Sequence, residues 1–328
     1  MFMPASVSSK TNVAPEHPAW EFACDVCAGL GRAQKELHSK YFYDELGSSL
    51  FEAITHLPEY GLTRADERLL RSHAADIAGL VRTPLSVIEL GSGNGRKTWY
   101  VLSALGNSER ALRYFPIDVS VNALVRCQRD LADVAQVYPL RQPYLDGLAS
   151  AVGQRDSGES LLVLFLGSNI GNFERASAME FLRDLRHSLQ PGDALLIGAD
   201  LVKERERMLA AYDDPAGVTA AFNLNLLARI NRELGGNFEL RNFQHEARWN
   251  DRERRIEMHL RSRVDQTVLI RDAGLTVQFR ADETIWTESS HKFYLAEMLE
   301  MAAQTGFRVE AQWVDQEWPF VESLWAAQ

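Results

Sequence analysis

The chain of 328 residues is 46% hydrophobic and 24% charged, so it is long enough to bury the core of one large domain or two modest ones. Its formal net charge is −10 and no block of clustered Lys and Arg occurs, which argues against a nucleic-acid partner because phosphate binding needs such a cluster. No run of about 18 apolar residues suits a membrane span, and we expect a cytoplasmic monomer that acts on a small molecule without a membrane partner.

The N-terminal region predicts helices. We expect residues 1–19 to form a loose N-terminal arm. Apolar residues then recur at helical spacing over residues 21–38 and 48–57. The first helical stretch contains Cys24 and Cys27, and Cys127 is the third cysteine of the chain. A redox pair or half of a zinc site is one interpretation, but no second Cys or His pair is evident, so two buried reduced thiols on or near a helix are favoured.

Four short apolar runs follow, separated by helical segments such as residues 121–137 and 176–189. The runs lie in "LSVIELGSGNG", "RYFPIDVS", "SLLVLFLGSNIGNF" and "DALLIGADLV". This alternation predicts an α/β fold with a doubly wound parallel sheet and helices on both faces. Such a sheet binds ligands at the carboxyl ends of its strands, so the loops after these runs are the expected place of a site. Residues 218–234 predict a further helix, and "FRVEAQWVDQ" predicts an edge strand.

The loop after the first run, "ELGSGNGRKT", is rich in glycine. Gly91, Gly93 and Gly95 allow the backbone to approach a ligand closely, and Glu89 at the strand end can accept a positive group or a hydroxyl. The spacing does not fit a phosphate loop. A dinucleotide-binding loop is the rival interpretation, but Arg96 stands where its third glycine would be.

An acidic residue also ends the second run. Asp118 lies 27 residues after Gly91, where a carboxylate can accept both hydroxyls of a ribose. Together with the acidic residue before the glycine loop, it favours S-adenosylmethionine over NAD. The alternative is that Asp118 only caps the next helix, with Ser120 as a competing cap.

Seven motifs, in order from about Tyr41 to the C-terminus, give the chain a resemblance to a known family. It resembles the histidine-specific Nα-methyltransferases of ergothioneine biosynthesis, within the S-adenosylmethionine-dependent methyltransferases that trimethylate amino-acid α-amines. The motifs are "YFYDELGSSLFEAITHLPEYGLTRAD", "ELGSGNGRKT", "YFPIDVS", "LFLGSNIGNF", "DLVK", "RIEMHLRS" and "TESSHKF".

The resemblance implies a Rossmann-like methyltransferase core with an inserted substrate-binding domain. We expect N-terminal helices that contribute to the substrate domain over residues 1–64 and the cofactor-binding core over 65–201. The inserted substrate domain would follow over 202–290, and a C-terminal helix and strands over 291–328 would complete the core.

The resemblance also implies S-adenosyl-L-methionine as methyl donor, with no metal. Gly91, Lys97 and Asp118 match the residues that hold the cofactor in similar proteins, and Glu89 and Gly93 of the same loop join them as candidates. Similar proteins tend to carry an Asp-aromatic pair against the adenine. The equivalent here is Pro143–Tyr144, which makes Tyr144 a candidate contact, or the acid has moved to Asp146.

For the amino-acid substrate, L-histidine, the resemblance implies two groups of contacts. Asn172 and Tyr212 would hold the head group and Tyr43 would lie close to the reacting amine, so Tyr43 and Asn172 are the candidate catalytic residues. The imidazole end would be bound by the remaining candidates, which are Tyr60, Glu288 and Ser290, with Met258 packed beside the ring. One departure is "PEYGLTR" where "PEYYPTR" is expected, which puts Gly61 and Leu62 beside Tyr60.

Glu288 and Ser290 are suited to bind an imidazole ring. In an extended segment they point to the same face, while His291 points the other way and is expected to be structural. A carboxylate and a hydroxyl together can pair with both ring nitrogens. The alternative for Glu288 is a surface ion pair with Lys292 or Arg254.

The reaction implied is trimethylation of the α-amino group of L-histidine to hercynine. A first rival is N-methylation of another amino acid, such as tryptophan or a derivative, which predicts no acid at position 288 and a smaller residue at position 258. A second rival is a catalytically silent binding protein, which would be expected to lack Asn172 or the glycine loop. This sequence has Glu288, Met258, Asn172 and the loop.

Overall fold

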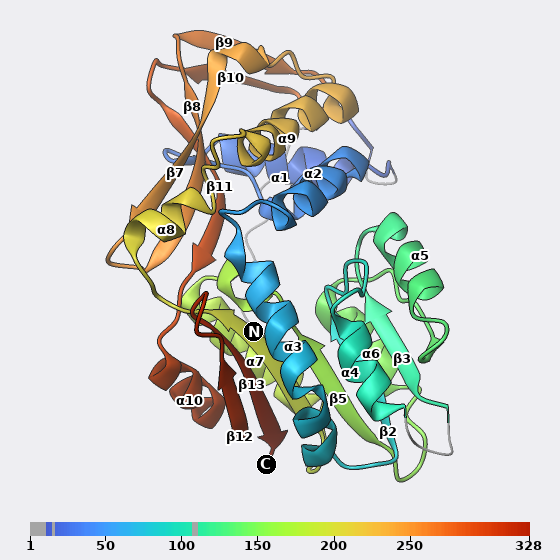
Figure 1. Ribbon diagram of the computed structural model, residues 1–328. Helices are drawn as coiled ribbons and strands as arrows, with labels where there is room; N and C mark the ends of the chain where they lie inside the picture. Colours follow the sequence, from blue (N-terminus) through green and yellow to red (C-terminus); the bar gives the residue numbers. More distant parts are fainter. Residues whose placement is uncertain (1–10, 15–16, 107–110) are drawn as a thin grey trace. The chain divides into compact units, whose positions relative to one another are not determined.

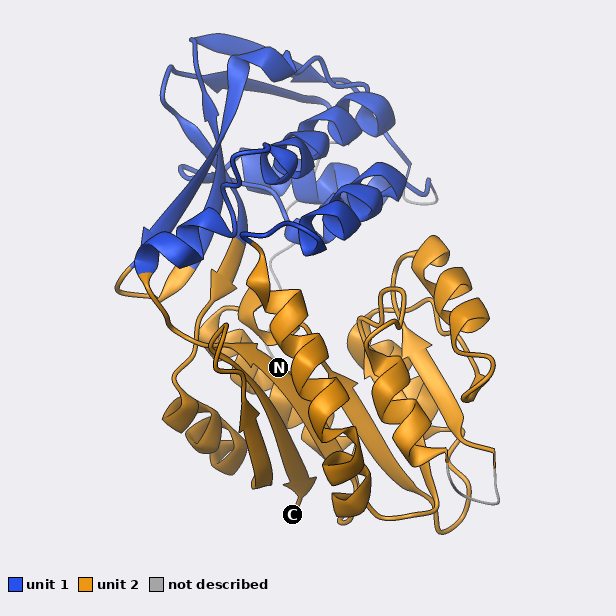
Figure 2. Cartoon of the chain, viewed as in Figure 1, with its two compact units in different colours: residues 1–59, 205–250, 256–288 blue, residues 60–204, 251–255, 289–328 orange. Residues whose placement is uncertain are grey.

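The computed structural model describes residues 11–14, 17–106 and 111–328. The chain divides into two compact units that interleave along the sequence (Figure 2). Unit 1 comprises residues 1–59, 205–250 and 256–288, and unit 2 comprises residues 60–204, 251–255 and 289–328. Within the described ranges, no helix is both long and apolar enough to cross a membrane.

Unit 2 contains a seven-stranded sheet with the strand order β12-β13-β6-β5-β2-β3-β4 (Figure 1). Strand β2 pairs in parallel with β3 and β5, β3 with β4, and β5 with β6, whereas β13 is antiparallel to β6 and β12. The parallel sheet of the predicted α/β fold is therefore present. The strands are β2 (Leu85–Leu90), β3 (Arg113–Ile117), β4 (Gln136–Val137), β5 (Ser160–Phe165), β6 (Ala194–Asp200), β12 (Phe307–Val314) and β13 (Phe320–Ala327).

Helices cover both faces of this sheet because its central strands are apolar on both sides. All six residues of β2 are buried, and alternate residues enter two separate cores, Val87 one and Ile88 the other. The core around Val87 includes residues of α3 (Gly61–Leu80), α4 (Thr98–Leu105) and α5 (Val121–Asp130). The core around Ile88 includes residues of α6 (Tyr144–Val152), α7 (Arg175–His187) and α10 (Leu295–Gln304).

The strand order predicts a ligand site at the end of β2. The chain goes from β2 to β3 on one side and returns to β5 on the other side of β2. Loops diverge at such a switch point, and ligands of open α/β sheets bind there, at the carboxyl ends of the strands. The loop that follows β2 is the glycine loop of the sequence.

Unit 1 consists of a four-stranded sheet in the order β1-β11-β8-β7, a two-stranded antiparallel sheet of β9 and β10, and several helices (Figure 1). Its strands are β1 (Lys35–Glu36), β7 (Phe243–Asn250), β8 (Arg255–Ser262), β9 (Gln266–Ile270), β10 (Leu275–Phe279) and β11 (Thr284–His291). The first residue of β8 and the end of β11 belong to unit 2. Its helices are α1 (Trp20–Leu30), η1 (Ser39–Phe42), α2 (Glu45–Thr55), α8 (Arg205–Ala210), α9 (Val218–Leu234) and η3 (Leu240–Asn242). A short turn in unit 2 is η2 (Asn169–Asn172).

Two predicted helices are shorter than expected. The first ends at Leu30, and residues 35–36 instead form β1, which pairs in parallel with β11. The second ends at Asp130, and residues 136–137 form the edge strand β4 beside β3. In both cases strand pairing with a distant segment overrides a local apolar spacing.

None of the three cysteines belongs to a disulfide. Cys24 and Cys27 lie on α1 and are half-buried, while Cys127 on α5 is buried. The expectation of reduced thiols on a helix is confirmed, although Cys24 and Cys27 are less buried than expected.

Candidate functional site

The glycine loop after β2 has a backbone that favours glycine. Gly91, Gly93 and Gly95 have φ of +75°, +53° and +70°, a region that side chains with a Cβ rarely adopt. A Cβ on Gly91 would lie 2.8 Å from the amide nitrogen of Asn169 and 3.1 Å from the hydroxyl of Tyr144. A Cβ on Gly93 would have no neighbour within 4 Å, so open space lies beside this part of the loop.

Asp118, which directly follows β3, binds the backbone of the glycine loop. Its Oδ2 accepts a hydrogen bond of 3.0 Å from Gly93 N, and its Oδ1 accepts one of 2.8 Å from Ser120 N. Burial raises the pKa of the carboxyl, against the lowering effect of these backbone donors. The cap of α5 is Ser120, whose hydroxyl accepts from Ala123 N, so the capping alternative for Asp118 does not hold.

Glu89 points into the core beneath the loop. It is 1% exposed, and its carboxylate accepts from the hydroxyl of Thr98 at 2.9 and 2.8 Å and from the hydroxyl of Tyr114. Burial raises the pKa of Glu89 to about 7, although these donors and Lys97 oppose the rise. Glu89 therefore joins the strand to the start of α4 at the base of the loop.

Lys97 connects the glycine loop to the loop after β5. Its ammonium forms an ion pair with Asp66 of α3, and Asp66 also accepts a hydrogen bond of 3.0 Å from Gly167 N. Burial lowers the pKa of Lys97, but the carboxylate of Asp66 more than offsets this and leaves it raised. Gly167 has φ of +71°, and a Cβ on it would lie 3.1 Å from Lys97 Nζ, so the two loops are in close contact.

Of the two adenine candidates, Tyr144 lies at the glycine loop. Pro143 precedes α6, and the ring of Tyr144 in its first turn packs edge-on against Phe165 at 5.5 Å between centroids. Burial raises the pKa of the phenol above its usual value. Asp146, two residues further along α6, is exposed.

The loop after β5 ends at Asn172, which is exposed at the end of η2. The preceding Gly171 packs against the end of β11, because a Cβ on it would lie 2.8 Å from the carbonyl oxygen of His291. Ser290, beside His291, is 5% exposed and its hydroxyl accepts a hydrogen bond of 3.0 Å from Lys292 Nζ. Within unit 2 the loop at 167–172 therefore contacts both the glycine loop and the strand end that carries Ser290.

A buried charged cluster supports this strand end. Asp200, the last residue of β6, pairs with Lys292 at 2.9 Å and with Lys203 at 2.6 Å. Burial alone would raise the pKa of Asp200, but the two ammonium groups hold it below its usual value. Trp318 adds a hydrogen bond of 2.9 Å from its indole nitrogen to the same carboxylate.

Tyr60 is 7% exposed and directly precedes α3. The next residue, Gly61, touches Trp318, because a Cβ on it would lie 2.2 Å from the indole ring. The replacement of the expected tyrosine by Gly61 therefore goes with a tryptophan that occupies the adjacent space.

Four candidate residues belong to unit 1. Tyr43 follows η1, and its ring meets Phe51 and Phe222 edge-on at 5.6 and 5.9 Å between centroids. Tyr212 and Met258 are 8% and 2% exposed. The fourth, Glu288, lies in β11 and is half-buried.

A buried hydrogen-bond network fixes the backbone around these unit 1 residues. The amide of Asn223 contacts His245 Nδ1 at 2.9 Å and accepts from the hydroxyl of Thr287 at 2.8 Å. The other ring nitrogen of His245 contacts the carbonyl of Tyr212 at 2.7 Å, and the carbonyl of Met258 lies 3.0 Å from the same Thr287 hydroxyl, as an alternative acceptor of its proton. Helix α9 thus holds the segments that carry Tyr212, Met258 and Glu288.

The candidate residues therefore divide between the two units. The cofactor candidates lie in unit 2 together with Tyr60, Asn172 and Ser290, whereas Tyr43, Tyr212, Met258 and Glu288 lie in unit 1. Among the described residues, no group of three or more His, Cys, Asp or Glu side chains could hold a metal ion.

Comparison with known proteins agrees with this geometry. Residues 22–327 match the family described as histidine-specific, S-adenosylmethionine-dependent methyltransferases. The chain belongs to this family. A histidine N-alpha-methyltransferase of Mycolicibacterium smegmatis is 41% identical over 325 residues, which is 97% of this chain and 99% of that protein.

Two further relatives match over smaller shares of the chain. A histidine N-alpha-methyltransferase of Mycobacterium tuberculosis is 41% identical over 304 residues, 92% of this chain and 93% of that protein. Ergothioneine biosynthesis protein 1 of Neurospora crassa is 36% identical over 203 residues, 61% of this chain and 23% of that protein.

Several residues of this methyltransferase were missed by the sequence analysis although they stand inside its motifs. Asn169 lies in "LFLGSNIGNF" and reaches Gly91, and Asp66 ends the first motif and binds Lys97. An acidic side chain at a buried position of α3 was the available signal for Asp66. Lys203 ends "DLVK" and Lys292 stands in "TESSHKF", but nothing in the sequence indicates that both meet Asp200.

The buried carboxyl of Glu89 predicts a pH dependence of stability. Its pKa is about 7 in the folded protein against 4.5 ordinarily, so between these values the folded chain binds more protons than the unfolded chain. Folding stability should then fall as the pH rises through this window, by about 3 kcal/mol. Glu89→Gln should remove this part of the dependence, as measured by urea unfolding at pH 5 and pH 8. An identical pH dependence in the variant would contradict the assignment.

Proposed function

We propose that this protein transfers methyl groups from S-adenosyl-L-methionine to the α-amino group of L-histidine until the trimethylated betaine hercynine is formed, a step of ergothioneine biosynthesis. The family match over residues 22–327 supports both the methyl donor and the amino acid. That the enzyme works as a cytoplasmic monomer, without nucleic-acid or membrane partners, stays a prediction.

One structural observation carries the proposal. The loop at 167–172 contacts the glycine loop through Asn169 and Gly167, and it contacts the strand end that carries Ser290 through Gly171. The same short loop therefore borders the candidate cofactor residues and presents Asn172, the candidate for the substrate head group. Methyl transfer requires this proximity, because donor and acceptor atoms must approach to about 3–3.5 Å before reaction.

The unit 2 residues fit the methyl donor. The open space at Gly93 admits a ligand against the backbone, and the carboxylate of Asp118 keeps lone pairs for ribose hydroxyls beyond its two backbone donors. Tyr144 and Gly91 would border the ligand on the side of α6. When bound, S-adenosylmethionine supplies an electrophilic methyl group on a sulfonium sulfur.

The chain's own part in the reaction is to bind, orient and exclude water. Asn172 and Tyr212 would hold the head group of histidine, and Tyr43 would face the amine. The α-ammonium must lose a proton before it can attack, and a cationic neighbour favours that loss. Water or the Tyr43 hydroxyl could take the proton, and no strong base is required.

We assign the choice of amino acid to the residues around the imidazole ring of the substrate. Glu288 and Ser290 would pair with the ring nitrogens, while Tyr60 and Met258 would pack against the ring. A side chain without a hydrogen-bond donor, such as that of phenylalanine, would leave the carboxylate unpaired, which costs several kcal/mol in a buried site.

The direct test is to incubate the protein with S-adenosylmethionine and each of the twenty amino acids and to measure mass gains. We expect histidine alone to gain three methyl groups, with one- and two-methyl species as intermediates. Methylation of tryptophan without histidine would overturn the substrate assignment. Methylation of no amino acid, with cofactor binding intact, would favour a silent binding protein.

A further inference from the structure

A second buried carboxyl group lies next to the ion pair of Lys97 with Asp66 in unit 2. It belongs to Glu322 of β13, which is 0% exposed and lies opposite Gly198 of β6. Leu324, two residues further along the same face of β13, belongs to the core that α3 shares with the sheet, and α3 packs against β13 (Figure 1). Glu322 therefore points from the sheet towards the helix that carries Asp66.

The neighbouring strand leaves room for this carboxyl group. A Cβ on Gly198 would lie only 2.6 Å from Glu322 Oε1, so a larger residue at this position would displace the carboxyl. Glu322 is also close enough to Asp66 for a hydrogen bond between their two carboxyl groups. The place of Glu322 is thus set by a glycine on one side and an acid on the other.

The hydrogen bonds of the two acids leave three oxygens without a donor. Asp66 Oδ2 accepts from Lys97 and, at 3.0 Å, from Gly167 N. Asp66 Oδ1 and both oxygens of Glu322 receive no hydrogen bond from an N–H or hydroxyl group of the described residues. Two ionised carboxylates cannot bond to each other, because neither has a proton to donate. Burial of both in that form would leave acceptors unpaired and like charges in contact.

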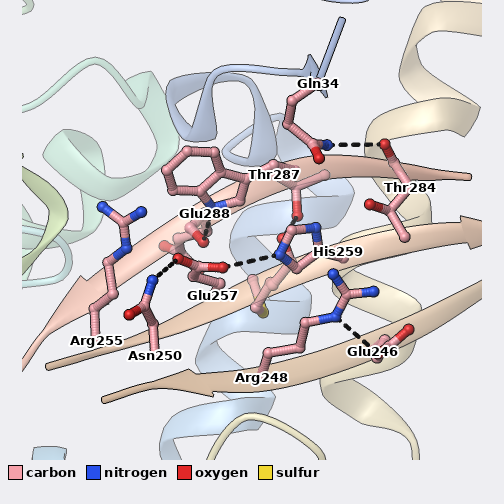
Figure 3. Close-up of polar contacts among 12 residues, drawn as sticks. Gln34, Glu246, Arg248, Asn250, Arg255, Glu257, His259, Thr284, Thr287 and Glu288 are labelled. Carbon is pink, nitrogen blue, oxygen red and sulfur yellow. Dashed lines mark hydrogen bonds and ion pairs between the residues drawn. The ribbon is translucent and has the colours of Figure 1, made fainter. Parts of the chain in front are cut away.

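Acids on the four-stranded sheet of unit 1 have the usual kind of partner. Glu246 accepts a hydrogen bond of 2.8 Å from Arg248 (Figure 3). On the same sheet, Glu257 accepts one of 2.9 Å from the amide of Asn250 (Figure 3). Glu322 differs from these acids, because the side chain that it meets is itself a carboxyl group.

A proton on Glu322 removes the conflict. A protonated carboxyl group is a hydrogen-bond donor, and Asp66 Oδ1 is an acceptor within its reach. Asp66 keeps its charge, because Lys97 and Gly167 N stabilise the ionised form. Burial and the negative charge of Asp66 raise the pKa of Glu322 well above its usual range, a rise that Lys97 opposes and Glu89 increases.

We propose that Glu322 is a positioning residue for the methyl donor, which stays protonated at neutral pH and donates a hydrogen bond to Asp66 Oδ1. This bond fixes Asp66 in the orientation that holds both Lys97 and Gly167 N, and so joins the glycine loop to the loop at 167–172. The side chain of Asp66 is fully buried and that of Lys97 is 23% exposed, so a buried bond determines where a partly exposed lysine lies. The inference rests on the proposed function, because it takes the glycine loop as the binding site of S-adenosylmethionine.

Two replacements of Glu322 distinguish the donor from the charge. Glu322→Gln keeps the shape and an N–H donor, so its affinity for S-adenosylmethionine should stay within about twofold of wild type. Glu322→Met has a similar length but no donor, and titration calorimetry should show binding about tenfold weaker. The KM for histidine at saturating S-adenosylmethionine should stay within about twofold in both variants, because the contacts of Asp66 lie at the cofactor end of the loop at 167–172.

Glu159→Met is the matched control for the loss of a buried carboxyl group. Glu159 is 6% exposed, directly precedes β5 and accepts a hydrogen bond of 2.7 Å from the hydroxyl of Ser86. It lies at the opposite end of β5 from the loop at 167–172, so its replacement should lower the melting temperature and leave cofactor affinity unchanged. An equal loss of affinity in both methionine variants would show a structural role only and overturn the inference.

Infrared spectroscopy tests the proton itself. At pH 8 the folded wild type should show the carbonyl band of a protonated carboxylic acid, which is separate from the carboxylate bands, and Glu322→Gln should lose this band. Three results would each overturn the inference: a wild type without the band, tenfold weaker binding by Glu322→Gln, and wild-type affinity in a folded Glu322→Met protein. The first two decide if Glu322→Met does not fold. Failure of the wild type to bind S-adenosylmethionine would instead overturn the proposed function.

Discussion

Replacing Gly93 by alanine is expected to weaken S-adenosylmethionine binding about tenfold or more, which corresponds to about 1.4 kcal/mol. No protein atom lies within 4 Å of a Cβ at this position, so the added methyl group would enter the open space beside the loop. If the cofactor occupies that space, the methyl group clashes with the cofactor and not with the protein. Titration calorimetry with S-adenosylmethionine and with its demethylated product measures the effect.

Gly158→Ala is a matched control for the backbone strain. Gly158, in the turn before β5, has φ of +77°, and a Cβ on it would also have no neighbour within 4 Å. Both replacements should cost about 1–2 kcal/mol of stability, since both force a side chain into the left-handed region. Only Gly93→Ala should lose cofactor affinity. Wild-type affinity in that variant would place the cofactor elsewhere.

The core of unit 2 could be predicted from the sequence because its signals are local. Runs such as residues 85–90 and 160–165 are mostly apolar and are followed by glycine at positions 91 and 167, which is the pattern of a strand buried on both faces. Helix α9 spans the predicted residues 218–234 and ends at Gly235, whose φ of +61° is the conformation of a glycine cap. The predicted edge strand is β12.

Features that depend on pairing between distant segments could not be predicted in the same way. Strand β1 has only two residues, and its partner lies 250 residues further along the chain, where Lys35 pairs with Ile285. Neither its length nor its composition distinguishes it from a helix end. The same holds for β4, which exists because β3 offers an open edge.

The candidate site shows the same division. Residues with a characteristic place in a motif, such as Asp118 after a strand, could be named as candidates directly. The side-chain partners of these residues could not, because the ion pair of Lys97 with Asp66 and the meeting of Lys203 and Lys292 at Asp200 depend on how helices and strands pack. Glu89 also illustrates the limit, since its position in the loop motif does not reveal that its carboxylate is buried against Thr98.

Asn172→Ala is expected to lower kcat/KM for histidine by about a hundredfold while leaving cofactor affinity within about twofold of wild type. Asn172 is exposed at the end of η2, so its removal should change the free energy of unfolding by less than about 0.5 kcal/mol. The loss of hydrogen bonds to a charged head group is worth about 1.5–3 kcal/mol, which gives the expected factor. Steady-state kinetics with histidine and thermal unfolding measure both effects.

Asn169→Ala is the matched comparison, because it removes the same amide three residues earlier in the same turn. The Asn169 amide lies near Gly91, so its loss should appear in the affinity for S-adenosylmethionine and not in the KM for histidine. Opposite effects of the two variants would separate the cofactor side of the loop from its substrate side. If Asn172→Ala kept full activity with histidine, Asn172 would have no part in holding the head group, and another residue would have to bind the amino acid at this loop.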